Sequence, residues 1–289
     1  MRTVFIFITL LFFIPANFFC VSRSAINTVT PAYPPGFYDN YSLPDKTVYI
    51  TFDDGPSEWT DRILDILKKE NVKGTFFISG NWAPHSTREN NSFKKFRSTL
   101  VRMINEGHSL GNHTVDHKDP AFLTPDQIER AFDENQELLD KELGKDSVKL
   151  TLLRPPFGSP WFYGYPESAK IKVGPVTRSR GAVIMWSKEF DSGDSKNWVK
   201  GDWYRGTPKI NTSNADFRRR MDWIYNRVIT SANGDGIVIL FHDTHRTTVE
   251  ILPAIIEKLK SYGYKFKTAE QLIKWKWKKG SAELLQQPM

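Results

Sequence analysis

The chain of 289 residues contains a single cysteine, Cys20, so no intramolecular disulfide can support its fold. Its 39% hydrophobic and 13% aromatic residues still suffice for a sizeable core in one large domain or two small ones. An exported bacterial envelope protein fits this lack of cross-links better than a disulfide-rich secreted domain does.

Recognition motifs for nucleic acid, internal repeats and a separate carbohydrate-binding module are also missing from the sequence. The formal net charge of +7 and the pI of about 9.3 favour contact with an anionic polymer or an acidic membrane surface. Because the sequence has no recognition motif for nucleic acid, we expect no nucleic-acid partner. The basic, aromatic stretch at residues 274–279 suits polymer or membrane contact, but it fits better as the solvated end of a last helix.

Long apolar runs are rare, and the clearest is Val4–Phe13 at the N-terminus. A small-residue site at Ser22–Ser24 follows it, which is typical of a cleaved signal peptide over residues 1–24. The alternatives are an uncleaved membrane anchor and a lipid-modified Cys20. We expect membrane contact only through this N-terminal segment, if it stays uncleaved. We expect an exported protein, located in the periplasm, in the cell envelope or outside the cell. Residues 25–46 are rich in proline and predict an extended lead-in.

From Thr47 onward, short β-branched and aromatic segments alternate with segments of helical periodicity. This alternation predicts an α/β domain over residues 47–289, in which helices cover a mostly parallel sheet that is open or closed into a barrel. Ligand sites in such folds lie where the strands end. The predicted strands are 48–52, 74–79, 108–112, 148–153, 182–186 and 237–241, and the predicted helices are 60–70, 92–106, 124–144, 215–230 and 249–260.

Two stretches interrupt the alternation. Residues 158–181 contain several aromatic, glycine and proline residues without a clear helix, and residues 191–214 are polar but include Trp198 and Trp203. Both predict long surface loops, and long loops at the rim of a site often contact substrate.

Acidic and histidine residues follow two of the predicted strands. Asp53 and Asp54 stand where one carboxylate can bind a metal while its neighbour acts on water. His113 and His117 are four residues apart and would share one side of a helical turn. With Asp54 they form a ligand set that leaves a position open for water, as in catalytic zinc sites. An acidic helix cap and two surface histidines are the ordinary alternatives.

Two further groups follow later strands. The prolines of Arg154–Gly158 stiffen a loop that can aim a backbone N–H at an oxyanion, and Arg154 can hold a carboxylate by paired hydrogen bonds. His242 is a natural general acid, and a carboxylate of Asp191 or Asp194 could favour its protonated form. A proline turn, a core histidine and a polar turn are the alternatives.

Taken together, the motifs resemble the polysaccharide deacetylases, which share the NodB homology domain and form carbohydrate esterase family 4. The resemblance rests on TFDDGP at residues 51–56, HTVDH at 113–117, RPPFG at 154–158 and LFH at 240–242. It covers residues 47–273 and implies a distorted (β/α) barrel with one divalent metal ion, usually zinc. The donor set also suits cobalt or nickel.

The resemblance also implies a role for each motif residue. Asp53 would be the base, oriented by Arg154, and His242 the acid. The N–H of Phe157, next to Pro156, would stabilise the oxyanion, and Leu240 would line the pocket for the acetyl methyl group. The metal ligands would be Asp54, His113 and His117.

Two departures from the family pattern affect these assignments. The family often has tyrosine where Phe157 stands, but the implied role uses only the backbone. Its fourth motif usually ends in Asp-Trp, whereas Asp194 is followed by Ser195, and a later Asp-Trp pair stands at residues 202–203. We assign Asp194 as the support of His242, with Asp191 second.

The activity implied is hydrolytic removal of N-acetyl groups from an N-acetylglucosamine-containing polysaccharide. Peptidoglycan is the first choice because the chain has the features of an exported, basic and disulfide-free protein, and a chitin-type polymer is the second. An O-acetyl esterase acting on another glycan and a non-catalytic glycan-binding protein are the alternatives.

Overall fold

The computed structural model describes residues 36–37, 43–81, 87, 89–145, 147–162, 164–195 and 215–285. The predicted export segment, most of the lead-in and residues 196–214 of the second predicted loop lie outside the described residues. None of the helices in the described ranges is both long enough and apolar enough to cross a membrane.

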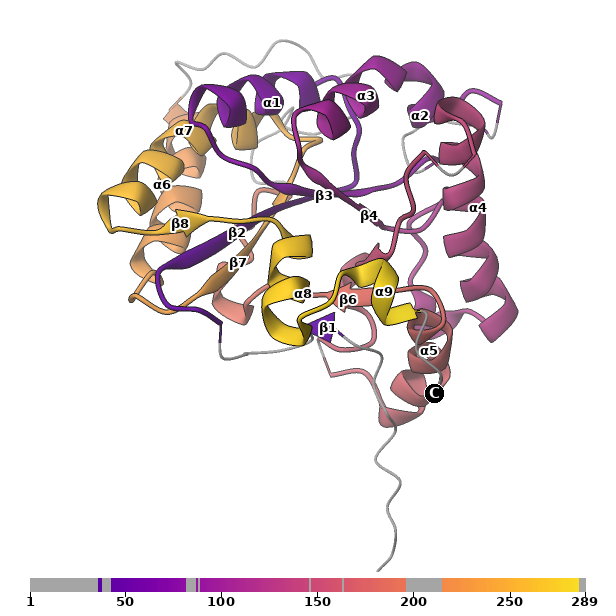
Figure 1. The fold of residues 1–289 in the computed structure, drawn as a ribbon. Coiled ribbons are helices and arrows are strands. Elements are labelled where there is room, and N and C mark those ends of the chain that lie inside the picture. Colours follow the sequence, from indigo (N-terminus) through magenta and orange to yellow (C-terminus); the bar gives the residue numbers. More distant parts are fainter. Residues whose placement is uncertain are drawn as a thin grey trace, which may run out of the picture. The chain divides into compact units, whose positions relative to one another are not determined.

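A curled, parallel sheet forms the centre of the described chain (Figure 1). Its strand order is β1-β6-β5-β4-β3-β2-β7, and β8 lies off this path, paired with the start of β2. The predicted α/β class and barrel-like sheet are thereby confirmed. The strand bounds are β1 Gly36–Phe37, β2 Thr47–Asp53, β3 Thr75–Ile78, β4 Ser109–Asn112, β5 Leu152–Leu153, β6 Ala182–Ile184, β7 Ile237–His242 and β8 Lys265–Phe266.

Helices surround this sheet, with α1, α3 and α7 along one side and α4 and α5 along another (Figure 1). Each amphipathic helix buries its apolar stripe against the strands. The helix bounds are α1 Thr60–Lys69, α2 Ser92–Lys95, α3 Arg97–Asn105, α4 Pro125–Leu143, α5 Glu167–Arg178, α6 Ala215–Thr230, α7 Arg246–Ser261, α8 Ala269–Trp277 and α9 Ser281–Leu285.

Helix α5 corrects one prediction, because it lies inside the stretch 158–181 that we expected to be a loop. The weak helical pattern has a local cause: Gly174 and Pro175 both stand within the helix. Burial of Val173 and Val176 in the core compensates for these poor helix formers. Tertiary packing therefore decides this element.

The sheet curls far enough for residues 187–192, which follow β6, to run beside β7. Ser187 donates its N–H to Val238 O at 3.0 Å, and Ser192 donates to Leu240 O at 3.1 Å. A further bridge joins Asp191 to Leu240. Since β6 and β7 lie near opposite ends of the strand order, this segment brings the two ends together and carries its acidic residues toward His242.

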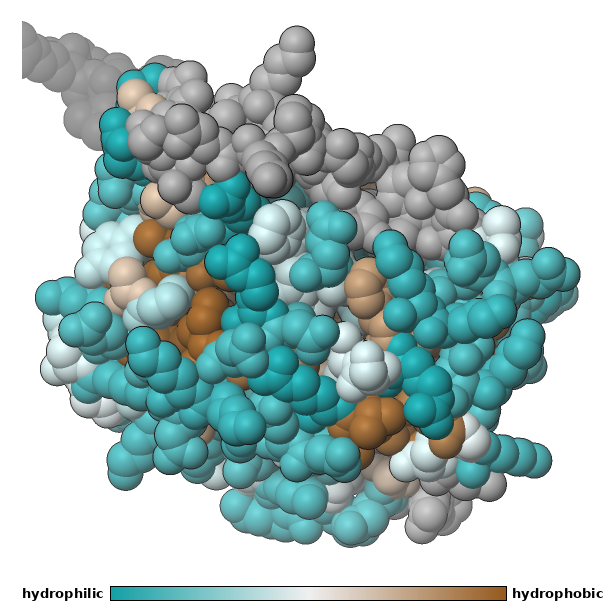
Figure 2. Space-filling view, turned by 90° about the horizontal axis from the view of Figure 1, so that it is seen from above, coloured by the Kyte–Doolittle hydropathy of each residue, from teal (hydrophilic) through white to brown (hydrophobic). Residues whose placement is uncertain are grey.

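Two clusters of buried side chains lie on either side of the sheet. Alternate residues of β2 divide between them: Val48 and Phe52 join the cluster under the outer helices, and Tyr49 joins the one inside the curl. The outer surface is mostly hydrophilic in the view from above, with small hydrophobic areas between (Figure 2). Because both faces of β2 are covered, all seven of its residues are buried.

Candidate active site

Asp53 is the last residue of β2 and Asp54 directly follows it, at the carboxyl edge of the sheet. Asp53 is the register partner of His242 on β7 and of Phe77 on β3. Asp54 leaves the strand with a φ of 79°, in the left-handed region that residues other than glycine seldom adopt. This backbone turn lets the two adjacent carboxylates take different directions at the same edge.

Asp54, His113 and His117 form a compact trio. Oδ1 of Asp54 lies 3.3 Å from Nε2 of His113 and 3.2 Å from Nε2 of His117. The three candidate ligand atoms all lie within 4.8 Å of one another. Burial alone would raise the pKa of Asp54, but His117 and hydrogen bonding to both histidines hold that pKa well below its usual value. The carboxyl is therefore ionised, as a metal ligand must be.

The two histidines meet by a route that differs from the predicted helical turn. Residues 113–117 form a bend after β4, in which Thr114 and His117 have positive φ values of 67° and 53°. Asn112 supports the bend by accepting a hydrogen bond from the Thr114 N–H at 3.0 Å. Asn135 of α4 in turn donates to Asn112 Oδ1 at 2.9 Å. A buried amide network thus replaces the helical hydrogen bonds that we had expected.

Arg154 is fully buried beneath the site and contacts three strands. Its Nη1 donates to Asp53 Oδ1 at 2.8 Å and to Thr51 Oγ1 at 2.7 Å, and its Nε donates to Ile184 O at 2.8 Å. The guanidinium lies over the ring of Phe77, 4.1 Å from its centroid. Burial lowers the pKa of Arg154, whereas Asp53 raises it. The hydrogen bond from Arg154 therefore fixes Asp53 through one carboxylate oxygen, Oδ1.

The backbone of Arg154 also orients His113. Its carbonyl oxygen lies 2.6 Å from His113 Nδ1, which fixes the ring so that Nε2 is the nitrogen directed toward Asp54. One residue therefore positions both the predicted base and a predicted metal ligand.

His242 and Asp194 form the second buried charge pair. Nδ1 of His242 lies 2.7 Å from Asp194 Oδ1, and the His242 N–H donates to Oδ2 at 2.7 Å. Thr248 of α7 also donates to Oδ2, at 2.6 Å. Burial lowers the pKa of His242, but the Asp194 carboxylate raises it to about 10. Asp191 instead accepts from the Gly193 N–H at 2.9 Å, so the geometry selects Asp194 as the partner of His242.

The three residues assigned to substrate contact lie around this centre. Phe157 is 51% exposed, has a φ of 61° and sets its ring edge-on to His117, with centroids 4.7 Å apart. Pro156 is buried in the same short turn, Pro156–Gly158. Leu240 is buried inside the curl of the sheet, among the aromatic residues of that cluster. The edge-on ring of Phe157 thus borders the candidate metal position.

Several residues that hold the site were missed in the sequence. Thr51 Oγ1 accepts a hydrogen bond from Arg154 Nη1 and donates to Ile239 O at 2.6 Å. Thr248 and Asn135 stand outside the motifs, and only their partners in space reveal them. Thr51 is part of the TFDDGP motif, and its position two residues before Asp53, on the same face of β2, was the one available signal.

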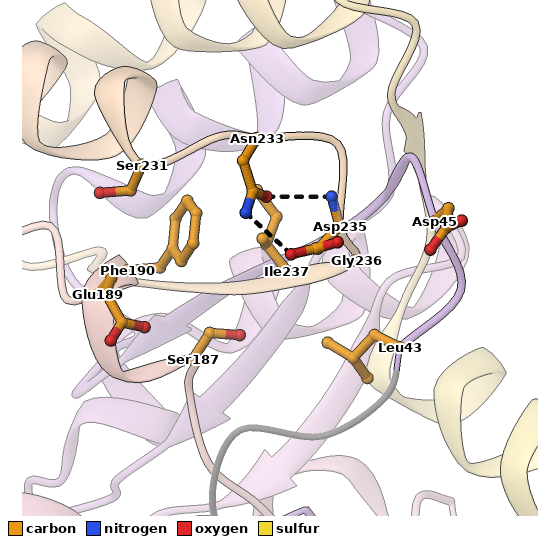
Figure 3. Close-up of a pocket in the computed structure, with 10 residues that line it drawn as sticks. All are labelled: Leu43, Asp45, Ser187, Glu189, Phe190, Ser231, Asn233, Asp235, Gly236 and Ile237. Carbon is orange, nitrogen blue, oxygen red and sulfur yellow. Dashed lines mark hydrogen bonds between the residues drawn. The ribbon is translucent and has the colours of Figure 1, made fainter.

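A separate cavity of about 540 Å³ lies at the other end of β7 (Figure 3). Asn233 and Asp235 hydrogen-bond across one side of it, and Phe190 and Ile237 contribute its apolar part. None of the candidate site residues lines this cavity. The chemistry therefore concentrates at the carboxyl edge of the sheet, as expected for an α/β fold.

The buried Asp–Arg and His–Asp pairs at the carboxyl edge of a curled α/β sheet fit a hydrolase, and the Asp54–His113–His117 trio could hold a metal ion. The family model described as polysaccharide deacetylase matches residues 40–169. The peptidoglycan-N-acetylmuramic acid deacetylase PdaA of Bacillus subtilis is 31% identical over 250 residues, which cover 86% of this chain and 78% of that protein. The chain belongs to the polysaccharide deacetylase family and is a polysaccharide N-deacetylase.

Other relatives agree. A peptidoglycan-N-acetylglucosamine deacetylase of Bacillus cereus is 32% identical over 76% of this chain and 68% of its own length. The crystal structure of the Bc1960 peptidoglycan N-acetylglucosamine deacetylase is similar with a TM-score of 0.58 and 28% identity, covering 83% of this chain and 92% of that one. The fold is also shared by BA3943 of Bacillus anthracis, a pseudoenzyme of carbohydrate esterase family 4, with a TM-score of 0.60, 23% identity and coverage of 83% and 69%.

Proposed function

We propose that this protein uses one divalent metal ion to hydrolyse the N-acetyl groups of peptidoglycan, with N-acetylglucosamine as the sugar. The observation that carries the proposal is the Asp54–His113–His117 trio, set between an Asp53 held by Arg154 and a His242 held by Asp194. The names of the relatives from Bacillus subtilis and Bacillus cereus support peptidoglycan as the polymer.

The trio fits a small divalent cation. Zinc ligands about 2.0–2.2 Å from the metal in a tetrahedron lie roughly 3.3–3.6 Å from one another. The separations of 3.3 and 3.2 Å between Asp54 Oδ1 and the two Nε2 atoms match this spacing. Oδ1 is buried and faces both Nε2 atoms, so it is directed toward the position that a cation would take. Zinc is the first choice, and cobalt or nickel would suit the same donors.

The bound metal would supply Lewis-acid polarisation and a lowered pKa for the attacking water. Asp53 takes the proton of that water. Arg154 binds Asp53 Oδ1, while Oδ2 lies 3.9 Å from His113 Nε2 and thus faces the trio. The base is therefore oriented and directed toward the position where water would lie.

The remaining steps use the two residues on either side of the trio. The Phe157 N–H, on its stiff turn, would donate to the oxyanion that forms when water attacks the acetyl carbonyl. His242 donates its proton to the leaving nitrogen as the C–N bond breaks. Acetate and a free amino sugar result. Leu240 provides an apolar wall for the acetyl methyl group.

The proposed place of action is outside the cytoplasm, where peptidoglycan lies. The signal-like N-terminus and the net charge of +7 support this placement, because a basic protein is attracted to an anionic wall.

Acetate release from a panel of acetylated glycans tests the proposal. Peptidoglycan, chitin oligomers and O-acetylated xylan are each incubated with the enzyme as isolated, after chelation, and after zinc is restored. We expect release from peptidoglycan that chelation stops and zinc restores. Release from the O-acetylated glycan alone would identify an esterase. Tight glycan binding without any acetate release would identify a binding protein like the pseudoenzyme that shares the fold.

A further inference from the structure

Asp243 is a buried carboxyl group that the proposed reaction does not use. It directly follows His242 at the end of β7 and is 1% exposed. Its Oδ2 accepts a hydrogen bond from Thr60 Oγ1 at 2.6 Å, and its backbone oxygen accepts one from Ser57 Oγ at 2.5 Å. Both partners belong to the connection that runs from Asp54 to the start of α1.

That connection also contains hydrogen bonds between its own residues. The Ser57 N–H donates to Thr60 Oγ1 at 2.8 Å, and the Trp59 N–H donates to Ser57 Oγ at 3.0 Å. Each hydroxyl therefore accepts from the loop and donates to Asp243. The loop after the metal-site aspartate and the residue after the predicted acid thus form one hydrogen-bonded unit.

The lack of a side chain at Gly55 lets the Asp243 carboxyl group pack against the backbone next to Asp54. A Cβ atom on Gly55 would lie 1.9 Å from Asp243 Oδ2 and 2.3 Å from Oδ1, so the carboxyl lies directly against the backbone that follows Asp54. Asp54 has the strained φ of 79°, which persists only where the surroundings hold it. Hydrogen bonds from Asp54 N to Phe77 O and from Ser79 N to Gly55 O hold it toward β3. The Asp243 carboxyl group packs against the same backbone at Gly55.

Keeping a carboxyl group at this position is costly for the fold. Burial raises the pKa of Asp243 to about 7, although hydrogen bonds from Thr60 and from the backbone of Gly55 act in the opposite direction. Burial therefore disfavours the charged carboxylate, and an apolar side chain would avoid that desolvation cost. The group is therefore better explained by what it positions than by stability alone.

We propose that Asp243 is a positioning residue that fixes the backbone of Asp54 relative to His242, and so sets the affinity of the Asp54–His113–His117 trio for a divalent cation. The inference rests on the proposed metal-dependent function. It deepens that function by giving the site a support outside its ligands, and such supports typically contribute about 10- to 100-fold to metal affinity.

The test measures zinc and cobalt affinity of the purified protein by competition with a chromophoric chelator. Thr60→Val keeps the shape of residue 60 and removes its hydrogen bond to Asp243, and Asp243→Asn removes the charge with little change of size. We expect each variant to bind zinc about 10- to 100-fold more weakly. Its acetate release should also keep rising at zinc concentrations that already saturate the unchanged enzyme.

Thr177→Val is the matched control. Thr177 is equally buried and, among the residues that the structure describes, donates to Val173 O and Gly174 O within α5. The substitution is the same threonine-to-valine change, so it shows what a buried hydroxyl contributes to the fold alone. We expect the control to lower thermal stability while leaving zinc affinity unchanged.

The positioning role is overturned if Thr60→Val and Asp243→Asn bind zinc as tightly as the unchanged protein, whatever their melting temperatures. Thr60→Val keeps the test decisive even if the Asp243 variant does not fold. The two proposals fail in different ways. Unchanged protein that binds zinc but releases no acetate contradicts the proposed function, and the affinity ratios still decide the role of Asp243.

Discussion

Nδ1 of His242 lies 2.7 Å from Oδ1 of Asp194, although 48 residues separate the two along the chain. The pair forms because the segment after β6 runs beside β7 and ends at Asp194. Oδ2 of the same carboxylate accepts from the His242 N–H and from Thr248 Oγ1. Hydrogen bonds to both oxygens therefore fix the ionised carboxylate, which can stabilise a positive charge on the imidazole.

Asp194→Asn is expected to move the alkaline limit of activity to lower pH. Burial lowers the pKa of His242, but Asp194, with smaller contributions from Asp54 and Asp53, raises it from 6.5 to about 10, so the acid keeps its proton until that pH is reached. Without the carboxylate, burial lowers the His242 pKa and the proton is lost at lower pH. The pH profile of kcat in the zinc-loaded enzyme measures the shift.

Asp191→Asn is the control for that profile, because Asp191 contacts Gly193 rather than His242. Its alkaline limit is expected to match that of the unchanged enzyme. An Asp194→Asn enzyme with an unaltered alkaline limit would show that this carboxylate does not set the protonation of the acid.

His113→Ala is expected to abolish metal binding and acetate release together, because it removes one of three ligand atoms. Elemental analysis and the acetate assay, carried out on the same preparation, measure the two losses. His108→Gln is the matched control. His108 is also buried, but its Nδ1 accepts from the Gly74 N–H at the opposite end of β4. Full metal content in His113→Ala would exclude this trio as the cation site.

His242→Ala is expected to keep the metal and to lose turnover. General acid catalysis typically contributes about 100- to 10,000-fold, and the leaving amine depends on it. Metal content should be unchanged, since His242 is not part of the trio. Single-turnover acetate release checks the loss, and a variant as fast as the unchanged enzyme would remove His242 from the mechanism.

Arg154→Ala is expected to cost about 3–5 kcal/mol of unfolding free energy, because it leaves the buried Asp53 carboxylate without its partner. Arg154 is fully buried and its ion pair with Asp53 measures 2.8 Å. Urea denaturation measures the change, and kcat should fall with it because the base is no longer oriented.

The comparison for that measurement is Arg180→Ala. Arg180 pairs with Asp133 at 2.7 Å, a similar distance, but Asp133 is half exposed. Exposed pairs contribute about 0–1 kcal/mol, so little stability should be lost. Equal losses in the two variants would contradict the view that burial makes the Arg154 pair critical.

Much of the site could be predicted from the sequence because its residues stand directly after strands. The end of a strand is a local property, and parallel strands place their carboxyl ends at one edge. Asp53, Asp54, His113, Arg154 and His242 therefore come together once the strands are correctly located. The helical turn expected for the two histidines was wrong, because positive φ values and the Asn112 amide determine that bend.

The order and chemical type of the motif residues and the alternation of strands and helices are determined by the sequence itself, because each depends on neighbours within a few positions. The tertiary structure alone decided that α5 forms across Gly174 and Pro175, that Asp194 rather than Asp191 meets His242, and that Asp243 lies against Gly55. These contacts join residues distant in the chain, and only the curl of the sheet and the packing of helices upon it bring them within hydrogen-bonding distance.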